Sequence, residues 1–253
     1  HVHGSLSQVR IGILFSSMQS LDPTEGTMTL NMWLRLSWED SSLAWSPHDF
    51  GDLTRVNLDP ARIWTPDVLP LNSAEGVPLD SMQETPPRAT REGNVTTVYW
   101  SRSGLMKVSC FSAGTQRTRP LDDGLAERFG RHWPSGIDLT LFPFDSQHCE
   151  LALGSWSHSE TTMDLQLMEP GKPWAESRGV EQFVTPSSEF RMKQVFAERI
   201  STAYSCCPGE RWPEVHFYLE LNRYSVDYLR NIISPVIVAV CMGFIAFLIP
   251  PEG

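Results

Sequence analysis

The feature that most constrains this chain is its uncharged, apolar C-terminal end. No Asp, Glu, Lys or Arg lies between Arg230 and Glu252, and residues 231–249 are about as many as a helix needs to cross the hydrocarbon core of a membrane. A buried helix of a soluble core is the alternative. Pro235 is tolerated near the end of a membrane helix. We therefore predict a folded domain over residues 1–223, and one transmembrane helix with its end over residues 224–253.

The cysteines place the larger part outside that membrane. Cys241 lies inside the apolar run, where it packs as a small hydrophobic side chain. The other four precede the run: Cys110, Cys149, Cys206 and Cys207. Cysteines on the outer side of a membrane anchor are typical of disulfide bonds in an oxidising compartment. Asn94-Val-Thr is a glycosylation sequon, so Asn94 is a predicted glycosylation site.

Residues of alternating polarity predict strands in the first part. The clearest run is 27–38, and shorter runs cover 137–141, 163–167 and 215–222. Turn-forming clusters separate them, which indicates an all-β, immunoglobulin-like β-sandwich. The charged segment at about 112–136 lacks periodicity and is predicted to be a long loop or an insertion. Trp33 lies on the polar face of its run, as a contact residue or as filler of a groove in its own domain.

Charge and motifs argue against several functions. The net charge of −10 argues against a nucleic-acid partner. The sequence has no Gly-x-Ser-x-Gly elbow and no His-Glu-x-x-His helix, so it does not predict an enzyme. Cys206 and Cys207 could form a bridge, remain free, or form half of a metal site with His148, His158 or His216. Zinc-binding cysteines are usually spaced further apart, so no metal and no cofactor are predicted.

Several blocks of the sequence resemble one known family. In chain order they are residues 33–40, 64–69 with 72–73, 142–149 with 153–157, 204–208, Arg223 and 232–235. Their order and spacing resemble those of the Cys-loop receptors, which are pentameric ligand-gated ion channels. The adjacent cysteines resemble those of α-type nicotinic acetylcholine receptor subunits. The resemblance implies an extracellular ligand-binding domain followed by the first transmembrane helix, with the chain ending before the pore-lining helix.

The resemblance also implies a ligand site of aromatic rings. A quaternary ammonium donates no hydrogen bonds, so rings hold it through cation–π contacts of about 0.5–2 kcal/mol each. The implied residues of the principal face are Trp156, Tyr204, Trp212, Cys206 and Cys207, with Leu71 in place of a family tyrosine. The implied residues of the neighbouring subunit's face are Trp33, Arg35, Tyr99 and Ser101. The implied disulfides are Cys110–Cys149, across a longer loop than the family has, and Cys206–Cys207.

Signal transfer to the membrane has implied residues as well: Glu25, Phe142, Pro143, Asp145 and Arg223. A half-buried guanidinium requires carboxylate partners, and a plain surface ion pair is the alternative. The prediction is thus a fragment of a cation-selective channel subunit that binds acetylcholine or a related cationic ligand between subunits. Its partners would be four other subunits and the lipid bilayer, at the postsynaptic plasma membrane. The alternative is a truncated, non-conducting protein that binds ligand or modulates assembly.

Overall fold

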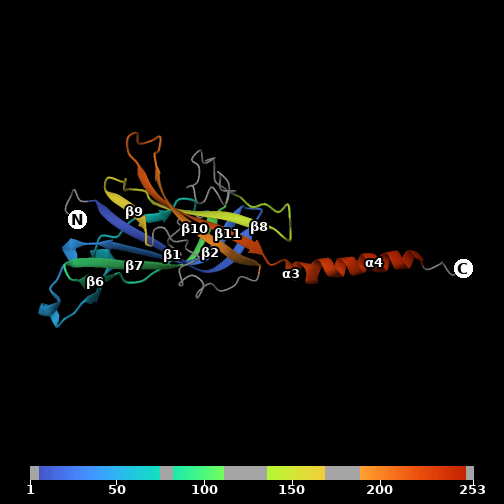
Figure 1. The fold of residues 1–253 in the computed structure, drawn as a ribbon, viewed down its shortest axis with the longest axis horizontal. Helices are drawn as coiled ribbons and strands as arrows, with labels where there is room; N and C mark the ends of the chain where they lie inside the picture. The colour runs from blue at the N-terminus through green and yellow to red at the C-terminus, as the bar shows by residue number, and fades with distance from the viewer. Residues whose placement is uncertain (1–5, 75–81, 111–135, 169–188, 249–253) are drawn as a thin grey trace.

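Two β-sheets packed face to face form the body of the protein, and a helix extends from one end (Figure 1). This computed structural model describes residues 6–74, 82–110, 136–168 and 189–248. Within these ranges a seven-stranded sheet has the order β3-β6-β7-β2-β1-β9, with β5 also paired to β7. The second, four-stranded sheet has the order β10-β11-β8-β4. The predicted all-β sandwich is confirmed.

The bounds of the elements follow the chain. The strands are β1 (Ser7–Asp22), β2 (Thr27–Glu39), β3 (Arg55–Asn57), β4 (Val68–Pro70), β5 (Gln83–Glu84), β6 (Arg88–Glu92), β7 (Val95–Ser109), β8 (Ser146–Ser155), β9 (Met163–Leu167), β10 (Phe190–Thr202) and β11 (Trp212–Arg223). Short 3₁₀ turns are η1 (Ser41–Leu43), η2 (Pro47–Phe50) and η3 (Pro60–Arg62). The C-terminal helix consists of α3 (Ser225–Tyr228), the π-helical turn η5 (Leu229–Ile233) and α4 (Ser234–Leu248).

The core lies between the sheets and follows the alternation of polarity. In β2 the six even-numbered residues from Met28 to Trp38 are all buried. In β11 the core residues are Val215, Phe217, Leu219 and Leu221. Because side chains in a strand alternate between its two faces, the even-numbered residues of β11 lie on the outer face of the four-stranded sheet. That outer face carries most of the candidate site.

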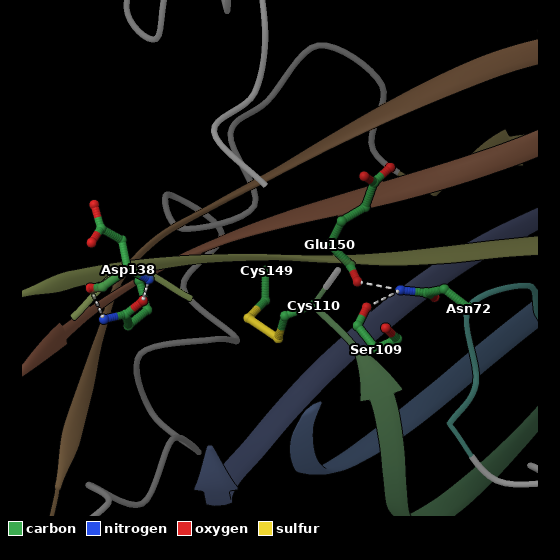
Figure 2. The surroundings of a disulfide bond; sticks show 7 residues. Asn72, Ser109, Cys110, Asp138, Cys149 and Glu150 are labelled. Carbon is green, nitrogen blue, oxygen red and sulfur yellow. Dashed lines mark hydrogen bonds between the residues drawn. A yellow bond between two sulfur atoms is a disulfide. The ribbon is translucent and has the colours of Figure 1, made fainter. Parts of the chain in front are cut away.

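The disulfide Cys110–Cys149 joins the two sheets (Figure 2). Cys110 follows β7 of the larger sheet, and Cys149 lies in β8 of the smaller one. Beside it, the side-chain amide of Asn72 donates to the carbonyl oxygens of Ser109 (3.0 Å) and Glu150 (2.6 Å), so it bonds to both sheets. This bridge is one of the two that the resemblance implied.

Two sequence predictions about strands need correction. Residues 137–141 do not form a strand: Asp138 accepts hydrogen bonds from the backbone N–H and the hydroxyl of Thr140, which closes a turn, and Leu139 and Leu141 are exposed. Conversely, β1 was not predicted. Shifts in its pairing with β2 at Phe15/Ser17 and Met18/Ser20 break the two-residue period. The predicted insertion 112–136 lies outside the described residues, apart from Gly136.

The apolar end forms the predicted helix. Residues Ser225–Ala246 are long and apolar enough to cross a membrane, with a mean hydropathy of 1.9, and the rest of the described chain buries none of that window. The π-helical turn η5 ends two residues before Pro235, which has no N–H to donate and crowds the carbonyl four residues earlier. The helix leaves the sandwich directly after β11 (Figure 1) and fits membrane anchoring.

Candidate functional site

Three neighbouring strands of the smaller sheet bring the first group of candidate residues together. Pro70 in β4 pairs with Leu153 in β8, and Gly154 in β8 pairs with Glu214 in β11. Leu71 follows β4, and its side chain covers Gly154 so closely that a Cβ there would lie 2.9 Å from Leu71 Cδ1. The glycine therefore leaves room for the leucine.

Aromatic rings project from the same strand ends. The rings of Tyr204 and Trp212 meet edge to face, with centroids 6.4 Å apart and planes at 74°. Trp156 follows β8, and its side chain is 78% exposed. The pairing of β8 with β11 ends at Gly154↔Glu214, two residues before Trp156 on one strand and two residues after Trp212 on the other. The indole N–H of Trp212 is buried and has no hydrogen-bond partner among the described residues. The Trp156 ring is thus largely exposed, whereas the indole N–H of Trp212 is enclosed without a partner in the described part of the chain.

Asp67, just before β4, holds the segment that carries Trp156. Its carboxylate accepts from the hydroxyls of Ser155 and Ser157 (2.6 Å each) and from the backbone N–H of Ser157 (3.0 Å), with Nδ1 of His158 also at 3.0 Å. Burial opposes ionisation, but these hydrogen bonds, led by that from Ser155, lower the pKa of Asp67. Because the Ser155 hydroxyl donates to the carboxylate, Ser155 and His158 do not form a nucleophile–base pair.

A second group of candidate residues lies on the outer face of the larger sheet. Trp33 is 41% exposed there, and Arg35 is exposed two residues further along β2. Arg35 pairs across the ladder with Ser101 of β7, and Tyr99 lies two residues from Ser101 on the same face. The core separates this group from Tyr204 and Trp212, so no single chain can join the two groups.

The profile of one protein family matches most of the chain. The family is described as the neurotransmitter-gated ion-channel ligand binding domain, and the match covers residues 1–115 and 135–225. This chain belongs to that family. The internal stretch that the match leaves out, residues 116–134, lies within the segment predicted to be an insertion, and the match ends near the start of the C-terminal helix.

Curated relatives in this family are acetylcholine receptor subunits. Subunit alpha-type acr-16 of Caenorhabditis elegans is 28% identical over 251 residues, which are 99% of this chain and 43% of that protein. Neuronal subunit alpha-2 of Mus musculus is 28% identical over 245 residues, 96% of this chain and 40% of that protein. Neuronal subunit alpha-10 of Homo sapiens is 26% identical over 245 residues, 97% of this chain and 46% of that protein. The chain spans less than half the length of each of these relatives. All three relatives are receptor subunits, which are not enzymes.

The adjacent cysteines of this family member are close but not bonded. Their sulfur atoms lie 2.6 Å apart, and both cysteines are free. The Cys206–Cys207 bridge that the resemblance implies stays a prediction.

Arg223, at the membrane end of the sandwich, lies in a polar and aromatic cluster. Its Nε and Nη2 donate to the two carboxylate oxygens of Asp145 at 2.8 and 3.1 Å, and Nη1 donates to Glu189. Its guanidinium lies over the rings of Phe190 (4.3 Å) and Phe142 (5.1 Å). The pair with Asp145 is almost fully buried, with side chains 4% and 1% exposed. It is therefore a buried pair rather than a surface one.

Two other residues implied for signal transfer lie as follows. Glu25 does not join the Arg223 cluster: it pairs with Lys107 at 2.5 Å, because its turn lies beside the end of β7. Glu189, which the sequence did not single out, takes that place. Pro143 follows Phe142 through a cis peptide bond in the loop before β8. The predicted glycosylation site, Asn94, lies in the exposed β6–β7 turn.

Proposed function

We propose that this chain is part of a ligand-gated, cation-selective channel subunit that binds acetylcholine or a related cationic ligand between neighbouring subunits. One observation carries the proposal: exposed or partly exposed aromatic side chains lie on both outer faces of a single sandwich, and we propose that each group is one half of a ligand site. Tyr204 and Trp212, with Trp156 at the neighbouring strand end, form the principal half-site. Trp33, with Arg35, Tyr99 and Ser101 around it, forms the complementary one.

The chemistry of both half-sites suits a cation without hydrogen-bond donors. Each well-placed ring contributes about 0.5–2 kcal/mol by cation–π attraction, so four rings supply enough for micromolar binding after the costs of association. Leu71 supplies neither a ring nor a hydroxyl, which favours a ligand with an apolar group at that end.

Assembly follows from the geometry of the half-sites. Because the core lies between them, a complete site requires a second chain whose complementary face meets the first chain's principal face. A contact between two different faces repeats head to tail, and it gives a closed ring when the rotation between neighbouring subunits closes. By resemblance to the family, the proposed ring has five subunits, this one and four others, in the postsynaptic plasma membrane. The helix 225–246 would contact the lipid bilayer.

A mixing experiment tests this proposal. Trp156→Ala and Trp33→Ala chains are expressed separately and together in membranes, and binding of labelled acetylcholine is measured. Each variant alone should lose at least about tenfold in affinity. The mixture should regain high-affinity sites at about a quarter of its interfaces, those where an intact Trp156 meets an intact Trp33. If the wild type binds but mixing restores nothing, the site does not lie between subunits.

A further inference from the structure

A buried histidine lies directly beneath the principal half-site. His216, in β11, is 8% exposed, and the neighbouring Glu214 is 6% exposed. The Nε2 atom of His216 lies 2.7 Å from Oε2 of Glu214, and its Nδ1 contacts Oε1 of Glu150 in β8. One imidazole thus bridges two carboxylates on adjacent strands.

This bridge reaches the aromatic ring of Tyr204. The other oxygen of Glu214, Oε1, accepts the Tyr204 hydroxyl at 2.5 Å. Burial, together with this bond to the carboxylate, raises the pKa of Tyr204, so the phenol keeps its proton. Burial opposes ionisation of Glu214, but the hydrogen bonds from His216 and Tyr204 lower its pKa. A continuous chain of hydrogen bonds therefore runs from Glu150 through His216 and Glu214 to Tyr204.

The chain of hydrogen bonds specifies the proton count of the histidine. A neutral imidazole has one N–H and one lone pair, whereas an imidazolium has two N–H groups. Ionised carboxylates only accept hydrogen bonds. Both contacts of His216 can therefore be hydrogen bonds at once only when its ring carries both protons.

We propose that His216 is a positioning residue for the ligand site. In its doubly protonated form it fixes Glu214, which in turn fixes the Tyr204 ring against Trp212. This inference rests on the function proposed above, because it assigns Tyr204 to the ligand. His216 itself does not contact the ligand: it acts through the carboxylate.

Protonation of His216 should then control the affinity for ligand. Among the residues that the structure describes, the titratable groups facing its ring include Glu214 and Tyr218 on β11, Glu150 on β8, and Glu198, its cross-strand partner on β10. When the ring loses a proton, a lone pair faces a carboxylate, and one of the two bonds breaks. The complete chain of hydrogen bonds from Glu150 to Tyr204 therefore requires the doubly protonated ring, and it is interrupted at one of the two His216 contacts once the ring is neutral.

The first test measures the affinity for labelled acetylcholine, whose quaternary ammonium does not titrate, on full-length chains in membranes between about pH 6 and pH 8.5. The wild type should lose about tenfold in affinity across this range, the equivalent of one charge-assisted hydrogen bond. His216→Gln should bind with a nearly constant, low affinity. His148→Gln, on the same sheet face beside Glu220, is the matched control and should keep the wild-type pH profile.

A second variant separates positioning from general damage to the fold. In Tyr204→Phe the ring remains but has no hydroxyl to reach Glu214, so the pH dependence should disappear. Combining it with His216→Gln should change the pH profile no further. If the His216→Gln profile keeps the wild-type slope while the chain still binds, the inference is wrong and the proposed function stands.

A measurement without ligand keeps the two proposals distinguishable. With 3-fluorotyrosine incorporated, the ¹⁹F resonance of Tyr204, assigned from its loss in Tyr204→Phe, should shift with pH in the wild type. It should not shift in His216→Gln. A resonance that moves equally in both would overturn the inference even if acetylcholine does not bind, whereas failure of acetylcholine binding alone would count only against the proposed function.

Discussion

Replacing Asp145 with Asn tests the buried cluster at the membrane end of the sandwich. The change keeps the shape of the side chain but removes its charge, and it turns an NH₂ group toward the guanidinium of Arg223. Two hydrogen bonds, of 2.8 and 3.1 Å, connect these groups, and both side chains are nearly inaccessible to solvent. Breaking a buried ion pair costs about 3–5 kcal/mol. Glu189 still neutralises Arg223 in part, so we expect a loss of about 3 kcal/mol in the free energy of unfolding.

Urea unfolding of the chain in detergent micelles, followed by tryptophan fluorescence, measures that loss. Glu189→Gln is the matched control: its partly exposed carboxylate should be worth under about 1 kcal/mol. Burial opposes ionisation of Asp145, but the hydrogen bonds from Arg223 and Gln147 lower its pKa. Its contribution is therefore present at neutral pH and is lost below about pH 4, as the pH falls through the folded-state value. A loss of less than about 0.5 kcal/mol at pH 7, or a larger loss in Glu189→Gln, would refute this reasoning.

Three further predictions concern other parts of the sandwich. Gly154→Ala should lower the free energy of unfolding by about 1 kcal/mol in urea, because the new Cβ meets Leu71. Adding Leu71→Ala should recover most of that loss. No recovery would mean that another contact is responsible. The hydrogen bonds that lower the pKa of Asp67 stabilise the fold above about pH 4, so Asp67→Asn should flatten the acid limb of stability against pH, and an unchanged limb would contradict this assignment. Asn94→Gln should remove one glycan without loss of stability, and the loss should be seen as faster migration on a gel. Thr96 is not a suitable alternative, because it is buried and bonded to Arg91, so its replacement would also disturb the fold. Unchanged migration would exclude a glycan at Asn94.

Local patterns were enough to predict the fold class. The alternation in residues 27–38 predicted β2 because one face of that strand is wholly buried, and the uncharged run predicted the C-terminal helix. The polarity pattern gave a wrong or no prediction where local hydrogen bonds or β-bulges change the backbone. A hydrogen-bonded turn at Asp138 and Thr140 replaces the predicted strand, and the register shifts between β1 and β2 break the alternation that would have predicted β1. These features depend on hydrogen bonds and register, which the sequence pattern does not encode.

The residues of the proposed ligand site could also be named from the sequence, through blocks whose spacing resembles a family. Only the pairing of strands into two sheets shows that Trp33 and Trp212 lie on opposite faces of one sandwich. Asp67 lies within one of the sequence blocks that carry the resemblance. Its hydrogen bonds to Ser155 and Ser157 join residues about 90 positions apart, so only the tertiary structure shows them.

Sequence alone predicted the strands of alternating polarity and the apolar C-terminal helix, and it named the aromatic residues of the proposed cation site. Tertiary structure decided which charges meet. Glu25 joined Lys107 rather than Arg223, and His216 joined Glu150 and Glu214, because sheet register sets which side chains are neighbours. A strand pattern shows which face a residue occupies, whereas its partner across the sheet depends on how distant strands align.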